Sequence, residues 1–230
     1  MKLINLFEEE HLENLAKILS GNKTYMFDGK KRTIHTFNDL RRYLARHNFK
    51  IKFVGSGLFS KGFLIESTNE KYILKISKNN GYYRNDGWFN FARYAKNKQH
   101  NPLFPKILYT GEILTSYLNQ TVGIGLVEYL NIPNNTEKLA NKIRKIFYYI
   151  IQKEFNVTTI DPDVFKMMTE KEDEMFNYLK ANNITLEDAV EFCEVIIECF
   201  NEFKVLDIKS QNIGFRKNGQ IVFFDPVAFN

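Results

Sequence analysis

Strand-forming and helix-forming segments are segregated along this chain, and that order restricts its fold more than any other feature. Short runs rich in β-branched and aromatic residues predict strands, at Lys50–Val54, Lys61–Glu66, Lys71–Ile76, Lys106–Leu114 and Val122–Leu130. Apolar spacings of three and four residues predict helices, at about 86–98, 136–153, 162–182 and 185–204. Strands with one helix, followed by helices, indicate an α+β fold of two lobes instead of an alternating parallel sheet.

The same order divides the chain. Residues 1–48 carry two amphipathic patterns and are expected to form a helical N-terminal extension. Residues 49–130 are expected to form a first lobe, a five-stranded antiparallel sheet with one helix. Residues 131–230 are expected to form a reduced, mainly helical second lobe. Thr185, with Asp188 three residues later, predicts a capped start for the last long helix.

The composition permits a buried core and shows no strong bias toward nucleic acid. Hydrophobic residues make up 44% of the chain, and the net charge is only +5. One basic cluster is formed by Lys30, Lys31, Arg32, Arg41, Arg42 and Arg46. Such a cluster could contact phosphates. Without a long basic stripe we interpret it as solvated surface, and we expect no nucleic-acid partner.

The sequence also argues against a membrane or secreted protein. No apolar run approaches the roughly 18 residues that a membrane-spanning helix needs. The first residues, Met1 to Phe7, lead directly into Glu8 and lack the uninterrupted apolar stretch of a signal peptide. Cys193 and Cys199 match neither a zinc spacing nor a disulfide framework. We therefore expect a cytoplasmic protein with reduced cysteines and no membrane partner.

A glycine-containing turn between the first two strands is the first candidate site. Gly55, Ser56 and Gly57 lie in it, Ser60 follows, and Lys75 lies on the third predicted strand. Glycines let backbone N–H groups approach phosphate oxygens, and a lysine on a neighbouring strand can neutralise them. Taken alone, such a turn is most often only a turn. No P-loop motif is present, and the strand-to-strand context argues against a dinucleotide-binding fingerprint.

The end of the sequence holds the second candidate site. Asn218-Gly219, between two apolar stretches, predicts a two-residue hairpin turn. Such a turn places Asn212 opposite Asp225, and an amide oxygen beside a carboxylate is a suitable oxygen site for Mg²⁺. Asp207 and Lys209 lie just before the hairpin.

These residues also have simpler structural interpretations. Asp207 could cap the preceding helix, and Asp225 could belong to a turn with Pro226. The combination, with a glycine turn upstream, favours a site in which Asp207 accepts the proton of an attacking hydroxyl and Lys209 balances developing phosphoryl charge.

Several motifs resemble the protein-kinase superfamily. The segment D-I-K-S-Q-N matches D-x-K-x-x-N, D-P-V stands where D-F-G is usual, and Y-I-L-K is similar to V-A-I-K. More specifically, G-S-G-L-F-S-K-G-F, N-P-L-F-P-K-I and the C-terminal hairpin resemble the early protein kinases of T7-like bacteriophages. The resemblance covers roughly residues 48–230 and implies a minimal bilobal kinase-like fold.

By position, the resemblance implies the role of each site residue. Asp207 would be the catalytic base and Lys209 the phosphate-contacting lysine, while Asn212 and Asp225 would hold Mg²⁺. In the nucleotide site Lys75 would contact the phosphates of ATP, and the backbone of a hinge that includes Glu128 and Leu130 would meet adenine. Asp86 is the candidate partner of Lys75, or alternatively the N-cap of its helix.

The chain also departs from ordinary kinases. Val205-Leu206 replaces the usual His-Arg, and only Pro226 to Asn230 follow Asp225, so the resemblance implies a missing activation segment. The expected function is transfer of the γ-phosphate of ATP to Ser/Thr hydroxyls of host proteins. One alternative is a small-molecule kinase of the aminoglycoside type, although Lys209 favours a protein substrate. The other is a pseudokinase or host-takeover binding protein without transfer activity.

Overall fold

The computed structural model describes residues 14–21, 23–56, 60–66, 71–77, 87–114, 121–199 and 208–225. By their internal contacts the residues form two compact units. Unit 1 consists of Met1–Ala92 and Lys106–Tyr129, and unit 2 consists of Arg93–Pro105 and Leu130–Asn230. Within the described residues no helix is both long enough and apolar enough to cross a membrane.

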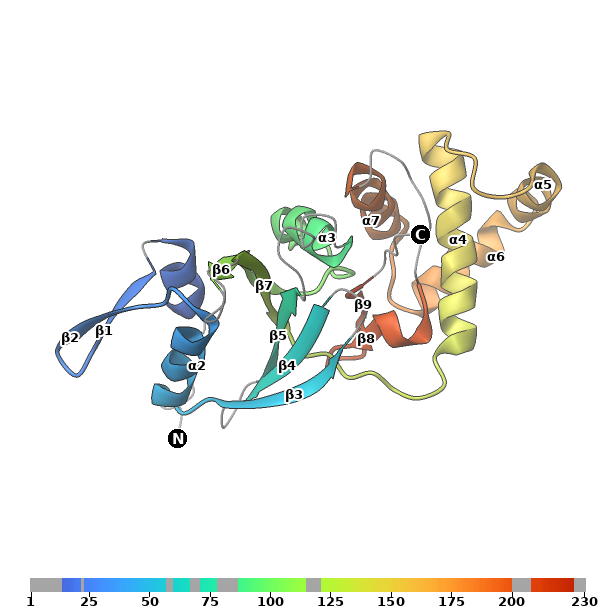
Figure 1. The fold of residues 1–230 in the computed structure, drawn as a ribbon. Coiled ribbons are helices and arrows are strands. Elements are labelled where there is room, and N and C mark those ends of the chain that lie inside the picture. The colour runs from blue at the N-terminus through green and yellow to red at the C-terminus, as the bar shows by residue number, and fades with distance from the viewer. Residues whose placement is uncertain are drawn as a thin grey trace. The chain divides into compact units, whose positions relative to one another are not determined.

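Unit 1 contains the expected five-stranded antiparallel sheet (Figure 1). Its strands are β3 (Lys50–Ser56), β4 (Ser60–Glu66), β5 (Lys71–Ser77), β6 (Ile107–Leu114) and β7 (Thr121–Glu128). They lie in the order β3-β4-β5-β7-β6, and every neighbouring pair is antiparallel. The helix α3 (Gly87–Ala95) follows β5 and continues into the short 3₁₀ helix η2 (Lys96–Lys98). This arrangement confirms the α+β fold expected from the order of segments.

A second, smaller sheet in unit 1 was not predicted. The strands β1 (Thr24–Phe27) and β2 (Lys30–Thr33) form a hairpin within residues 1–48, where only helices were expected. Its turn residues Asp28 and Gly29 have φ values of 49° and 67°, as a two-residue type I′ turn requires. Asp-Gly is a recognised signal for this turn, so the sequence did contain the information. The strands are short, and the neighbouring helical patterns obscured them.

The hairpin lies next to the amphipathic helix α2 (Phe37–Arg46). The helix begins with a capping box, in which Thr36 and Asp39 satisfy each other's backbone N–H groups. Its buried face carries Leu40, Tyr43 and Leu44, which join the core formed by the sheet. Residues 14–20 form a further helical segment, and its Leu15 and Leu19 belong to the same core.

Unit 2 is mainly helical (Figure 1). Its helices are α4 (Glu137–Phe155), α5 (Pro162–Thr169), α6 (Glu172–Ala181) and α7 (Leu186–Cys199). The single helix predicted at 162–182 is therefore two helices. The break lies at residues 170–171, and at the start of α6 the Glu172 carboxylate pairs with Lys153 on α4.

An aromatic cluster anchors the C-terminal hairpin of unit 2. The hairpin consists of β8 (Ile213–Phe215) and β9 (Ile221–Phe223). The ring of Phe223 lies 5.4 Å from that of Phe147 on α4 and 5.0 Å from that of Phe192 on α7, centroid to centroid. All three side chains are fully buried. Because aromatic pairs in such contact resist displacement, Phe223 fixes the hairpin two residues before Asp225.

Candidate functional site

The glycine turn leaves open space beside its backbone. Gly55 pairs with Gly62 of β4, just after a register shift that leaves Val54 as the extra residue of a bulge. A Cβ added to Gly55 would have no atom of the described residues within 4 Å, and φ is not positive there. Neither packing nor backbone conformation therefore requires glycine at position 55. Open space beside an accessible backbone is what a phosphate group would need.

The other predicted residues of this turn differ in exposure. Ser56 is exposed and pairs with Lys61, whereas Ser60 is only 7% exposed and pairs with Ser77. Gly57 lies outside the described residues.

Lys75 lies on the third strand of the sheet, where the sequence placed it. On β5 it stands between two glycines, Gly62 of β4 and Gly125 of β7. Its Nζ lies 4.6 Å from the ring centroid of Trp88 on α3, close enough for a cation–π interaction. A Cβ at Gly125 would come within 2.2 Å of the Trp88 ring, so this glycine is needed for the indole to fit.

Sequence reasoning missed the role of Trp88, which it treated only as an apolar helical residue. The available signal was a tryptophan placed just after Asp86, together with a glycine in the middle of a buried strand. Asp86 itself lies outside the described residues, so its pairing with Lys75 stays a prediction.

Glu128 and the residues after it are tied to neighbouring strands. The Glu128 carboxylate accepts a hydrogen bond from Lys106 N–H at 2.7 Å, and Glu128 N–H donates to the Lys106 carbonyl at 2.9 Å. The next N–H group, of Tyr129, donates to the Lys71 carbonyl at 3.2 Å. In unit 1, therefore, the Glu128 side chain supports the sheet edge, and two backbone donors of the predicted hinge are already used.

Leu130 opens unit 2 and is nearly buried, with 6% of its surface exposed. It packs directly on the hairpin, because a Cβ at Gly214 would lie only 2.5 Å from Leu130 Cβ. The next residue, Asn131, exchanges two backbone hydrogen bonds with Phe215. Within the described part of the chain, the N–H of Leu130 donates to no acceptor.

The C-terminal hairpin corrects one prediction. The pairs Ile213↔Phe223 and Phe215↔Ile221 require a three-residue loop, Lys217 to Gly219, instead of a two-residue turn. Gly219 has a φ of 84° and donates its N–H to the Arg216 carbonyl, which is a type I turn followed by a bulged glycine.

Asn212 consequently lies opposite Phe224, whose N–H donates to the Asn212 carbonyl at 3.2 Å. The expectation that Asn212 directly faces Asp225 was wrong by one residue. The two residues remain close along the open end of the hairpin, since Asp225 follows the residue that pairs with Asn212.

The side chains near this end differ in exposure. Asn212 closes the short helix η3 (Ser210–Asn212) and is only 8% exposed, whereas Asp225 is partly buried and Lys209 is exposed. The side-chain oxygens of Asn212 and Asp225 suit Mg²⁺, because an amide oxygen and a carboxylate are hard ligands that leave coordination positions for water and phosphate. Asp207 lies outside the described residues. Among those that are described, no group of three or more His, Cys, Asp or Glu side chains gathers to form a complete metal cage.

Two polar side chains of unit 2, the half-buried Arg216 and the buried Asn101, fix the hairpin and the loop beside it and were not singled out from the sequence. Arg216 donates to the carbonyls of Pro102 and Phe104, both at 2.8 Å. Asn101, 1% exposed, donates to the Asp188 carbonyl and accepts from Leu103 N–H. The segment N-P-L-F-P-K-I (residues 101–107), which is part of the family resemblance, therefore has a structural role: its carbonyl groups hold the hairpin through Arg216.

An open pocket lies beside the segment that contains Lys209. It has a volume of about 580 Å³ and is lined by residues 132–135 with Ser210 and Gln211. The Thr136 hydroxyl, at the start of α4, donates to the Ser210 carbonyl at 3.3 Å and fixes one wall of the pocket. The pocket offers space for an acceptor group next to the proposed catalytic segment.

Comparison with known proteins adds little to this description. No family model matches the chain, and no curated protein matches it. Among solved structures, it is similar to the crystal structure of a protein named as a fructosamine-3-kinase from Haemophilus somnus 129PT. The two share 16% sequence identity, with 84% of this chain and 72% of the other covered, and the TM-score is 0.35. At that score the similarity supports no conclusion about activity.

Proposed function

We propose that the chain is an ATP- and Mg²⁺-dependent kinase that transfers the γ-phosphate to Ser or Thr hydroxyls of proteins. One observation carries the proposal: Lys75 lies on the third strand of an antiparallel sheet whose first strand, β3, has open space beside Gly55 near its end. In kinases a glycine-rich loop covers the phosphates and the lysine of the third strand contacts them.

Different residues would bind the phosphates, the adenine and the metal ion of the nucleotide complex. Backbone N–H groups around Gly55 approach the phosphate oxygens, and the Lys75 ammonium neutralises part of their charge. The N–H of Leu130 donates to a ring nitrogen of adenine. Asn212 and Asp225 hold Mg²⁺, which when bound neutralises charge on the phosphate oxygens.

The transfer step needs one proton acceptor and charge stabilisation. As the acceptor oxygen forms a bond to the γ-phosphorus, the bond between this phosphorus and the bridging oxygen breaks and ADP leaves. The hydroxyl proton passes to the Asp207 carboxylate, and the Lys209 ammonium offsets charge on the transferred group. Because Lys209 is exposed beside the open pocket at 132–135, a protein side chain can reach it.

The proposed substrate class rests on the motif D-I-K-S-Q-N, in which Lys209 follows Asp207 by two residues. This motif resembles the catalytic loop of protein kinases. By the same resemblance the substrates would be host proteins of a phage.

The test measures transfer of labelled phosphate from Mg²⁺-ATP to mixed protein substrates and, in parallel, to aminoglycosides and glycated amines. Lys75→Met and Asp225→Asn should each lower protein labelling by about 100-fold or more, the usual effect of losing an electrostatic or acid–base group. Lys52→Met is the matched control, an exposed lysine on β3 of the same sheet.

Three results would contradict the proposal. Unchanged labelling by both variants would show that Lys75 and Asp225 do not take part in transfer. Labelling of small molecules alone would show that the substrate is not a protein. Nucleotide binding without any transfer would indicate a binding module.

A further inference from the structure

Four residues of the basic cluster line a pocket in unit 1, distant in sequence from the proposed catalytic segment. The pocket has a volume of about 250 Å³ and lies at the β1–β2 hairpin and α2. Lys31 and Arg32 line it from β2, and Arg42 and Arg46 line it from α2. Because side chains alternate along a strand, Arg32 shares the face of its partner Tyr25, which packs on α2, whereas Lys31 shares the face of the exposed Met26. The fold thus brings two separate basic segments around one hollow.

Aromatic contacts hold the hairpin against the helix. Tyr25 on β1 and Tyr43 on α2 meet edge to face with centroids 4.8 Å apart. Arg46 donates to the Tyr25 hydroxyl at 2.8 Å, and its guanidinium carbon lies 5.2 Å from the Phe27 ring centroid. The position of Arg46 is therefore fixed before any ligand arrives, which lowers the entropy cost of binding.

The positive charge of the pocket is not balanced by its own carboxylate. Asp39 is the acidic residue in the lining, and it accepts hydrogen bonds from Thr36 N–H and from the Thr36 hydroxyl while pairing with Arg42. Within the described residues, Arg32 and Arg46 take part in no ion pair. Cations that face one concave surface without carboxylate partners create a strong local attraction for an anion.

We propose that this pocket binds the phosphate group of a phosphorylated side chain in a protein segment. Arginine guanidinium groups present paired N–H donors that match phosphate oxygens, and arginine clusters are a general means of recognising phosphorylated proteins. A nucleic acid presents a row of singly charged phosphates and calls for a basic stripe. Here the cations converge on one small hollow, which favours one compact, doubly charged group.

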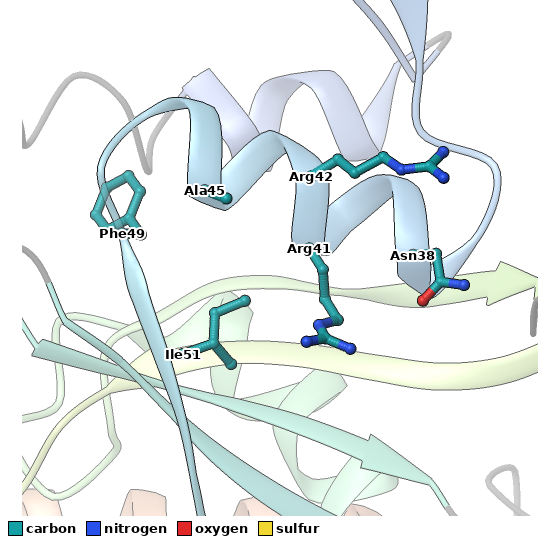
Figure 2. A pocket seen from close by; sticks show the side chains of 6 residues that line it. All are labelled: Asn38, Arg41, Arg42, Ala45, Phe49 and Ile51. Carbon is teal, nitrogen blue, oxygen red and sulfur yellow. The ribbon is translucent and has the colours of Figure 1, made fainter.

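Arg41 provides a matched control on the same helix. In Figure 2 the Arg41 side chain extends from α2 toward Ile51 on β3, whereas Arg42 extends away from that strand. Arg41 lines a second pocket, with Asn38, Phe49 and Ile51, and is not among the residues that line the proposed phosphate site, whereas Arg42 lines both pockets. Replacing Arg41 changes the charge of the helix without changing the lining of that site.

The experiment measures fluorescence anisotropy of labelled Gly-Ser-rich peptides containing one phosphoserine, against the same peptides with serine or glutamate and against an oligothymidylate. No ATP is added, so the result does not depend on the proposed function. We expect the phosphoserine peptide to bind at least about tenfold more tightly than the serine peptide, as hydrogen bonds to charged groups allow. The double variant Arg32→Gln/Arg42→Gln should lose that advantage, and Arg41→Gln/Lys52→Gln should keep it.

Other outcomes would overturn the proposal. Equal binding of phosphoserine and serine peptides, or no binding of either, would show that the pocket does not recognise phosphate. An equal loss in both double variants would indicate general attraction to positive charge. Tighter binding of the oligothymidylate would assign the surface to nucleic acid. Urea unfolding of each variant establishes that the protein remains folded, and Arg32→Gln alone, which disrupts no ion pair, provides a second test.

Discussion

Glycine serves opposite purposes at positions 55 and 125. At Gly125 the missing Cβ makes room for the buried ring of Trp88, which in turn lies beside the Lys75 ammonium. At Gly55 no described atom occupies the space that a Cβ would take. Packing within the protein therefore explains Gly125 and does not explain Gly55, for which we propose the approach of a phosphate group.

Gly125→Ala should destabilise unit 1. The added carbon would lie 2.2 Å from the Trp88 ring, so the indole or the strand must move. Overpacking of this kind costs about 1–3 kcal/mol, which urea unfolding followed by tryptophan fluorescence can measure. Since the chain has one tryptophan, the emission spectrum reports directly on Trp88. Parental stability and an unchanged spectrum would contradict the close contact.

Gly55→Ala should behave in the opposite way. Its stability should remain within about 0.5 kcal/mol of the parent, because the methyl group meets open space. Its affinity for Mg²⁺-ATP should fall about tenfold, since the methyl group would occupy space needed by a phosphate. Nucleotide titration by calorimetry provides the measurement. Unchanged affinity would show that phosphate does not approach this glycine.

The elements that carry the candidate residues were predictable where the pattern is local in sequence. The apolar pattern located the strand of Lys75, and Asn218-Gly219 located the hairpin between Asn212 and Asp225, although its register was wrong by one residue. The roles of these residues stay predictions. The contacts of Arg216 with Pro102 and Phe104 were not predictable, because the partners are more than a hundred residues away and nothing in the local pattern indicates them. Long-range polar contacts depend on tertiary packing, which periodicity does not encode.

At the scale of elements, the start of α2 depends on an ionised carboxylate. Burial acts to raise the pKa of Asp39, but the hydrogen bonds from Thr36 and His35 and the charge of Arg42 outweigh it and hold the pKa below 3.8. A carboxyl whose pKa is lower in the folded state stabilises the fold above its unfolded pKa, and this contribution disappears as pH falls through the folded value.

Asp39→Asn should therefore show a stability deficit that depends on pH. Near pH 7 the variant should be less stable by about 0.3–1 kcal/mol, the usual contribution of a negative charge at a helix N-terminus. The difference between parent and variant should be constant down to about pH 5 and shrink below pH 4. Urea unfolding at each pH measures it, and other titrating groups cancel in the difference. A deficit that persists unchanged at pH 3 would exclude the carboxylate charge as its cause.

Two threonines at helix starts have different roles. Thr185 accepts a hydrogen bond from Asp188 N–H at 3.0 Å and caps α7, as the sequence predicted. Thr136 precedes α4 but makes no side-chain cap, and its hydroxyl instead donates to Ser210.

Thr185→Ala should cost about 0.5–2 kcal/mol of stability and leave the rate of phosphate transfer per folded molecule unchanged. Thr136→Val should cost less than that in stability and should lower transfer, because it loosens the segment that holds Lys209 and Asn212. Urea unfolding and the labelling assay separate the two effects. Equal effects on transfer would contradict a positioning role for Thr136.

The sequence predicted the regular elements well and their connections less well. Alternating apolar residues located the five strands of the sheet to within two residues at each end. Asn218-Gly219 fits both a two-residue and a three-residue loop, and the conformation of Gly219 alone decides between them. That choice shifted the partner of Asn212 by one residue. Turn residues indicate that a hairpin exists more reliably than they fix its register.

At the scale of the whole molecule, the chain builds its two units from non-consecutive segments. Residues 93–105 interrupt unit 1 in sequence but belong to unit 2, where Asn101 and the carbonyls accepting from Arg216 hold the hairpin. The nucleotide-contacting Lys75 and the metal-binding Asp225 are proposed on different units. A ligand that needs residues from both should stabilise the protein only when both sets are intact.

Mg²⁺-ATP should therefore raise the thermal unfolding temperature in a way that depends on both residues. At about 100 times its Kd the nucleotide should contribute about 2.7 kcal/mol, or several degrees for a chain of this size. Lys75→Met should reduce the rise with or without Mg²⁺, because in the proposed function the ammonium contacts phosphate directly. Asp225→Asn should remove only the part of the rise that requires Mg²⁺, and Lys52→Met should change neither. If ATP stabilises Asp225→Asn as strongly as the parent at every Mg²⁺ concentration, the Asp225 carboxylate does not hold a metal for the nucleotide.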